Sequence, residues 1–150
     1  MPATPADAER LARELYGMDA TATALPGECD ENFRLTASDG QEYALKIMRA
    51  GCDRAFLELQ SRAFEKLSGL PVPRVSAIES PIAETADGRL VWLLDWLPGR
   101  LLADIKPRTP KILQDLGKLL GTIDARLEDF SHPAAHREFK WDIRRAGWIR

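Results

Sequence analysis

The sequence is short of cysteine, histidine and long apolar runs, and each shortage excludes a class of protein. Two cysteines in 150 residues, Cys29 and Cys52, lie outside any CxxC pair, so neither a disulfide framework nor a cysteine zinc site is expected. The longest apolar run, Leu90 to Leu94, has five residues, whereas a membrane span needs about 20. The first ten residues lack the pattern of a secretory signal. These features predict a cytoplasmic protein with reduced thiols.

Neither sign of charge dominates. With 21 basic and 23 acidic residues the net charge is -2, which gives no general attraction to nucleic acid or to anionic membranes. His132 and His136 have a spacing that suits metal ligands on a helix, but Pro133 lies between them and no other ligand motif accompanies them. We interpret HPAAH as the start of a helix and the basic segment 137–150 as a solvated helix face. No nucleic-acid or membrane partner is therefore expected.

The first third of the chain carries one helix pattern followed by three strand patterns. Hydrophobic residues make up 45% of the sequence and charged residues 29%, an ordinary globular balance. An apolar stripe at helical spacing predicts a helix over 5–16, ended by Gly17. Three strands are expected next, with a tight turn at 38–40 between the second and third. Their ranges are Ala20–Leu25, Asn32–Ala37 and Glu42–Met48.

The middle of the chain adds a helix and two more strands. Asp53 is the expected N-cap of the helix. Val75–Ile78 is predicted as a short strand, and Arg89–Leu97, the most apolar strand, follows a second hairpin turn at 86–88. The expected fold is therefore α+β, a five-stranded antiparallel sheet with one inserted helix.

A helical segment follows the sheet. Thr109 before a proline marks a helix start, and the apolar face of this helix runs through 109–129. Gly117 and Gly121, four residues apart, predict close packing of another element, and Asp142 is expected to begin a further helix. We divide the chain into a lobe, a linker and the start of a helical lobe, at 1–98, 99–108 and 109–150. Because the helix over 109–129 has a broad apolar face, we expect self-association through it or through the segment 141–148.

A single lysine, Lys46, interrupts an apolar strand. A buried lysine without a partner costs free energy, and Ala44, Lys46 and Met48 share one face of the strand. Two interpretations stay open: a lysine whose charged end reaches solvent, or a cation held at the sheet surface to bind an anion such as phosphate.

The order of these segments resembles a known family. ENFRL, YALKIM, FLELQSRAFEKL, LPVPRV and LLDWLPGRLL follow one another as in the small lobe of the protein-kinase-like fold. The resemblance is closer to the aminoglycoside phosphotransferase and choline kinase superfamily, and closest to the hydroxylysine-kinase-type phosphotransferases. It runs from about Leu25 to Trp141. In bacteria such sequences occur in the N-terminal part of longer proteins that also carry a class III aminotransferase domain.

The resemblance implies an ATP site. Lys46 matches the lysine that pairs with the α- and β-phosphates, and the turn 27–32 matches the loop that covers them. Only Gly27 of a glycine-rich loop is present, so side chains such as Asn32 are expected to substitute for backbone contacts. The Asp95 carbonyl and the Leu97 amide match the hinge groups that bind the adenine edge.

The partner of the matched lysine has two candidates on the following helix. Glu58 supplies the charge that the chemistry favours, but helical spacing places it on the polar side, where an ion pair with Arg62 also explains it. The same spacing turns Gln60 toward the sheet, and an amide would orient Lys46 without neutralising it. Both candidates stay open, with Glu58 preferred.

The catalytic half of such a kinase is missing from the sequence. No HGD, HRD or DFG motif occurs, so this chain is expected to hold no catalytic residue, and Mg²⁺ is expected to be held by residues outside it. Asp142 lies in a segment that matches the family's linker rather than its catalytic loop. We therefore expect an inactive nucleotide-binding lobe, with the small-molecule acceptor bound only in the complete protein. The alternative is a non-catalytic interaction module that retains a kinase-like lobe.

Overall fold

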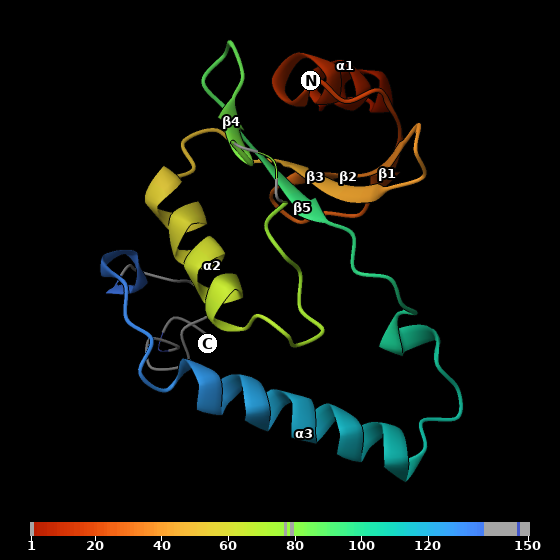
Figure 1. Cartoon of the computed structure of the whole chain (residues 1–150), viewed down its shortest axis with the longest axis vertical. Helices are drawn as coiled ribbons and strands as arrows, with labels where there is room; N and C mark the ends of the chain where they lie inside the picture. Colours follow the sequence, from red (N-terminus) through yellow and green to blue (C-terminus); the bar gives the residue numbers. More distant parts are fainter. Residues whose placement is uncertain (1, 77, 79, 137–146, 148–150) are drawn as a thin grey trace.

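The computed structural model describes residues 2–76, 78, 80–136 and 147. They form a five-stranded antiparallel sheet with a helix on each face (Figure 1). The elements are α1 (Pro5–Tyr16), β1 (Ala20–Leu25), β2 (Glu31–Ala37), β3 (Glu42–Ile47), α2 (Arg54–Lys66), β4 (Ile82–Glu84), β5 (Leu90–Asp95), η1 (Leu102–Asp104), α3 (Pro110–Leu127) and η2 (Pro133–His136). The strand order is β1-β2-β3-β5-β4. The expected α+β class, with one helix inserted into the sheet, is confirmed.

Helix α1 begins and ends at the residues that the sequence predicts. The Asp7 amide donates to Thr4 Oγ1 at 3.2 Å, and the Thr4 amide donates to the Asp7 carboxylate at 2.9 Å, which completes a capping box. Gly17, with φ of 62°, adopts the left-handed conformation that ends the helix. The buried stripe of α1, Ala8, Leu11 and Ala12, packs on the sheet.

The two faces of the sheet carry separate cores. Successive residues of a strand point to opposite faces, so each strand contributes to both. On the α1 face the buried strand residues are Ala22, Phe33, Leu35, Leu45, Ile47, Val91 and Leu93. On the α2 face the buried residues are Met48, Leu57, Leu90, Trp92 and Leu94. Phe64 of α2 stacks on Trp92 with ring centres 5.9 Å apart, and this packing fixes α2 against the sheet.

One predicted strand is replaced by another. Among the described residues of the predicted strand 75–78, Val75 forms an isolated bridge to Leu94, while Ile82–Glu84 forms β4 on the edge of β5. The β4–β5 turn explains the exchange, because the Thr85 amide donates to the Arg89 carbonyl at 2.9 Å and closes a local hairpin. Strand β4 pairs with β5 across a short turn, since Glu84 lies opposite Leu90, and so loses little loop entropy, whereas Val75 lies 19 residues before its bridge partner Leu94.

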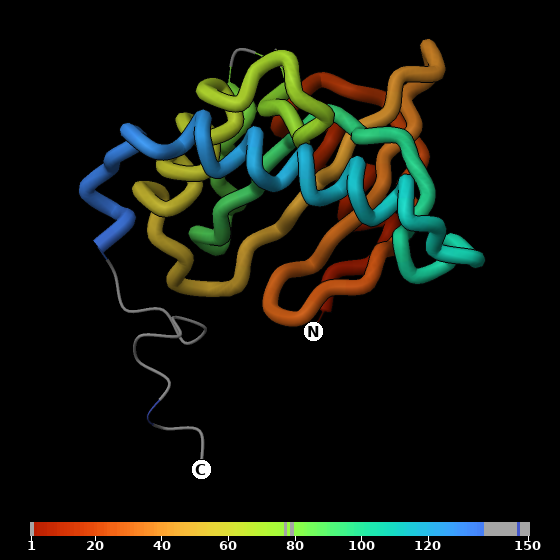
Figure 2. The backbone as a smooth tube through the Cα atoms, turned by 90° about the horizontal axis from the view of Figure 1, so that it is seen from below, coloured from red at the N-terminus to blue at the C-terminus, as the bar shows by residue number. Residues whose placement is uncertain are grey.

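Helix α3 lies outside the two cores of the sheet. Thr109 caps it, as predicted, by accepting the Ile112 amide at 3.3 Å. In Figure 1 it runs below α2, and Figure 2, seen from below, shows it crossing the lobe. Its C-terminal end is held to the turn after α2, where Arg126 donates to the Ser68 carbonyl at 2.8 Å. No residue of α3 is buried against the described part of the chain.

The open face of α3 corrects one expectation. A Cβ at Gly117 or Gly121 would meet no described atom within 4 Å, so the close packing predicted there is absent from the described residues. Leu113 and Leu120 are 53% and 52% exposed. The helix expected from Asp142 lies outside the described residues. Among the described helices, none has the length and apolar character needed to cross a membrane.

Candidate nucleotide site

The strand register aligns Asn32, Lys46 and Trp92 in one row across β2, β3 and β5. Directly opposed residues of antiparallel strands point to the same face, and Trp92 belongs to the core under α2. Lys46 therefore points to the α2 face, opposite to its neighbour Ile47. Its ammonium group is half-buried, and Nζ donates to Asn32 Oδ1 at 2.7 Å.

Asn32 also closes the loop between β1 and β2, residues 26–30. Its Nδ2 donates to the Pro26 carbonyl at 3.3 Å and to the Asp30 carbonyl at 3.2 Å. The Asp30 carboxylate in turn accepts the Arg49 amide at 3.1 Å, just beyond β3. The loop is thus tied back to the end of the strand that carries Lys46.

Gly27 is the residue on which this loop conformation depends most. A Cβ at position 27 would lie 2.1 Å from the Asp30 carbonyl oxygen and 2.4 Å from Asn32 Nδ2. Both distances are well below van der Waals contact, so any other side chain requires the loop backbone or the Asn32 amide to shift. A single glycine therefore permits the fold of this loop, although the glycine-rich pattern is absent.

The two residues of α2 predicted as partners of Lys46 differ in their exposure to solvent. Glu58 is exposed, while Gln60 is half-buried and its Nε2 donates to the Phe56 carbonyl at 3.3 Å. Helical spacing predicted this difference in orientation. Among the described residues, Lys46 bonds to Asn32 and to neither of these side chains.

The hinge after β5 presents backbone groups at the sheet edge. The Asp95 amide donates to the Arg74 carbonyl at 2.9 Å, and the Trp96 amide donates to the Glu42 carbonyl at 3.1 Å. In a strand the N–H and C=O of one residue point to the same side, so the Asp95 carbonyl faces the Arg74 side. Within the described chain no partner is seen for the Leu97 amide, and Leu97 is 45% exposed.

A hollow of about 300 Å³ lies beside these hinge groups. Its walls come from the start of β3, the segment after α2 and the hinge: Gln41, Glu42, Val72, Arg74, Asp95, Trp96, Leu97 and Pro98. The edge toward which the Asp95 carbonyl points is therefore open to a ligand.

Arg34 fixes one wall of the hinge. Its Nε donates to Glu42 Oε1 at 2.9 Å, and its guanidinium lies over the Trp96 ring, 4.6 Å from the ring centre. Such a contact contributes about 0.5–1 kcal/mol at an exposed site. It ties the hinge to β2, and sequence reasoning had given Arg34 no role.

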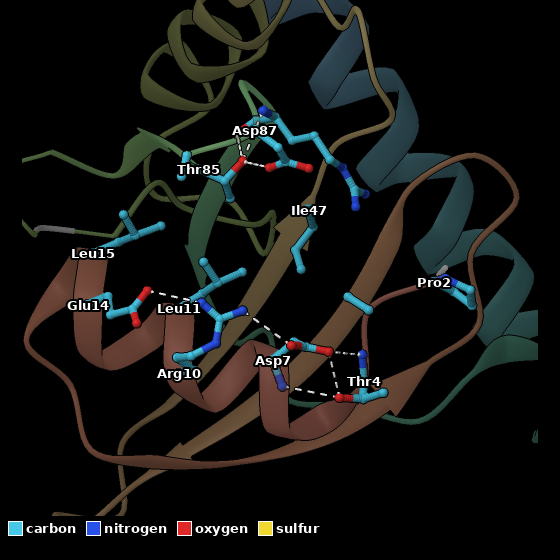
Figure 3. Close-up of a pocket in the computed structure, with 13 residues that line it drawn as sticks. Pro2, Thr4, Asp7, Arg10, Leu11, Glu14, Leu15, Ile47, Thr85 and Asp87 are labelled. Atoms are coloured by element: carbon cyan, nitrogen blue, oxygen red, sulfur yellow. Dashed lines mark hydrogen bonds and ion pairs between the residues drawn. The ribbon is translucent and has the colours of Figure 1, made fainter.

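A larger cavity, of about 540 Å³, lies on the opposite face of the sheet between α1 and the β4–β5 turn (Figure 3). On the α1 side of the cavity Arg10 bonds to Asp7 at 3.2 Å and to Glu14 at 3.1 Å. On the other side Arg89 pairs with Glu31, which lies outside the lining, at 2.9 Å. The Thr4 hydroxyl and amide, with Arg10, lower the pKa of Asp7 to about 2. Ile47 lines this cavity and Lys46 points the other way, so the cavity is separate from the lysine row.

Known proteins resemble this chain in sequence. Residues 21–149 match the family model described as the phosphotransferase enzyme family, APH. The chain belongs to this family. It is 34% identical over 137 residues to hydroxylysine kinase of Danio rerio, and the alignment covers 82% of this chain and 38% of that protein. It is 29% identical over 166 residues to hydroxylysine kinase of Mus musculus, covering 94% of this chain and 44% of the relative.

A solved structure supports the fold assignment. The amicoumacin kinase hAmiN, in complex with AMP-PNP, Ca²⁺ and Ami, superposes with a TM-score of 0.66 at 18% identity, over 80% of this chain and 39% of that one. The phosphotransferase lobe expected from the sequence is confirmed. The chain spans less than half the length of these curated relatives. The matches give no support to an attached aminotransferase domain.

Proposed function

We propose that this chain is the nucleotide-binding lobe of an ATP-dependent small-molecule phosphotransferase. The observation that carries the proposal is the Lys46–Asn32 pair beside the loop of residues 26–30. An amide orients the ammonium without neutralising it. A lysine has three N–H donors, so two remain for phosphate oxygens.

The hinge suits the other end of the nucleotide. The Asp95 carbonyl accepts and the Leu97 amide donates, which is the pairing that the adenine edge requires. Along β5, Asp95 lies three residues beyond Trp92, the neighbour of Lys46, a span of about 10 Å at roughly 3.3 Å per residue. That span leaves room for a ribose between the base and the phosphates.

The catalytic step belongs to residues beyond this lobe. When bound, ATP supplies the phosphoryl group, and the chain's own residues bind and orient it. In the described part of the chain no group of three His, Cys, Asp or Glu side chains is placed to hold a metal ion. We therefore assign Mg²⁺ and the base to the complete protein and expect this chain alone to be inactive.

The acceptor is proposed to be an alcohol or amino alcohol similar to hydroxylysine. This part of the proposal rests on the curated relatives, which are named hydroxylysine kinases. The acceptor is bound only in the complete protein. A cytoplasmic location is proposed because Cys29 and Cys52 are both thiols.

Two assays test these statements. In an equilibrium titration, Lys46→Ala is expected to weaken ATP binding, whereas Lys111→Ala, an exposed lysine paired with Asp115, leaves it unchanged. Equal binding by both variants contradicts the site.

With labelled ATP and hydroxylysine we expect no transfer, and turnover abolished by Lys46→Ala would refute the inactivity. Absence of any nucleotide binding favours the alternative, a non-catalytic interaction module.

A further inference from the structure

We infer that Asn32 couples Lys46 to the loop of residues 26–30, so that phosphate bound at Lys46 and the closed loop stabilise each other. This inference rests on the proposed function, because it assumes that Lys46 binds phosphate. It assigns Asn32 a positioning role in place of the direct phosphate contact expected from the sequence.

The hydrogen-bond inventory of the side-chain amide supports this role. An asparagine has two N–H donors and one carbonyl acceptor. Here Nδ2 donates to the carbonyls of Pro26 and Asp30, and Oδ1 accepts Lys46. The flipped amide would set two donors against each other and face two carbonyls with an oxygen, so these partners fix its orientation.

No other side chain of this size satisfies the same three partners. An aspartate at position 32 would accept from Lys46 but would turn a carboxylate oxygen toward the Pro26 and Asp30 carbonyls. An alanine would leave all three groups without this partner. Gly27 packs directly against the same amide, since a Cβ there would lie 2.4 Å from Nδ2. The loop conformation and the position of Lys46 therefore share one side chain.

The coupling follows from this shared side chain. When phosphate holds the Lys46 ammonium in place, the bond to Oδ1 is retained more of the time and Nδ2 stays directed at the loop carbonyls. When the loop opens, the Asn32 side chain is free to rotate and no longer holds the Lys46 ammonium in position. By thermodynamic linkage, phosphate at Lys46 stabilises the closed loop by the same free energy by which the closed loop strengthens phosphate binding.

The test combines amide hydrogen exchange with nucleotide titration on the whole chain. In the wild type, ATP is expected to slow exchange of the Cys29 and Asp30 amides, and in Lys46→Met it is expected to leave that exchange unchanged. Asn32→Ala is expected to weaken ATP binding about tenfold, the scale of one charge-assisted hydrogen bond, and to leave adenosine binding unchanged. Cys29→Ser, an exposed change in the same loop, is the matched control and is expected to behave as the wild type.

Asn32→Asp separates positioning from simple charge pairing. We expect it to weaken ATP binding at least as much as Asn32→Ala, because the carboxylate neutralises Lys46 and cannot donate to the loop. ATP binding that is retained or improved in Asn32→Asp overturns the inference. So does ATP that shifts the Lys46 side-chain resonances in the wild type without protecting the loop, and this measurement needs no Asn32 variant to fold. If ATP affects neither Lys46 nor the loop, the proposed function fails and the inference falls with it.

Discussion

Replacing Gly27 by alanine tests the loop geometry without changing any charge. The added methyl carbon would lie 2.1 Å from the Asp30 carbonyl oxygen and 2.4 Å from Asn32 Nδ2. Neither atom can move independently, because one belongs to the backbone and the other is held by two carbonyls and, through Oδ1, by Lys46. The alanine variant must therefore either open the loop or keep it closed with a strained contact.

The cost of opening sets the expected magnitude. Opening breaks the two bonds from Nδ2, each worth about 0.5–1.5 kcal/mol net, so about 2 kcal/mol is lost together. A clash accommodated in place costs about 1–3 kcal/mol, and the chain adopts whichever response is cheaper. We expect Gly27→Ala to lower the free energy of unfolding by about 1–2 kcal/mol.

Urea unfolding and hydrogen exchange provide the assay. Gly99→Ala is the matched control, since a Cβ at Gly99 meets no described atom within 4 Å, and it is expected to leave stability nearly unchanged. Faster exchange at residues 28–30 should accompany the loss in Gly27→Ala. If both variants are equally stable and exchange of the loop amides is unaltered, the account of the loop is refuted.

Acid, core truncation and the open helix give further tests. The pKa of Asp7 is lowered from 3.8 to about 2 in the folded chain. Its ionised carboxylate therefore contributes to stability above pH 4, and this contribution is lost as the pH falls toward about 2. The difference in unfolding temperature between the wild type and Asp7→Asn should narrow over that interval, and a constant difference would contradict this. Leu57→Ala, at a side chain 0% exposed, should lower the free energy of unfolding by about 2–5 kcal/mol, against little change for Leu101→Ala, which is 72% exposed. In sedimentation the wild-type chain should have a mass above its 16.8 kDa. The double variant Leu113→Lys, Leu120→Lys should be a monomer, and a wild-type monomer at high concentration contradicts association through α3.

The meander of β1 to β3 was predictable because its signals are local. Alternating side chains and the turn at residues 38–40 define both strands and register. The same register reveals the Lys46 contact, since Asn32 and Lys46 are each seven residues from Asp39 and so lie opposite one another. The two partners predicted from the sequence, Glu58 and Gln60, lie instead on the following helix.

The edge of the sheet was less predictable. The apolar residues of Val75–Ile78 resemble a strand, but the described residues of this segment contribute one bridge, from Val75 to Leu94. The turn at 86–88 already implied a strand on both of its sides, and β4 is the strand that was missed. Which segment occupies an edge depends on long-range packing, which a local pattern does not contain.

The hinge illustrates the same limit for the site. The sequence indicates where β5 ends, but not that the Asp95 amide is taken by the Arg74 carbonyl, 21 residues away, or that both residues line a hollow. The contact of Arg34 with Trp96 is likewise set by the order of strands in the sheet. Local propensity identified the elements, and tertiary pairing determined which groups of the site remain available.

The central claim is that Lys46 and the hinge bind a nucleotide, and an NMR titration of the whole chain with ATP tests it most directly. The account predicts shift changes at residues 27–32, 46 and 94–97, with an affinity no better than about millimolar because one lobe encloses little of the ligand. Binding should weaken in Lys46→Ala and with added salt, since the contact of the half-buried Lys46 with phosphate is an ionic contact that salt screens in part. Micromolar affinity, or shifts that avoid all three regions, would contradict the account.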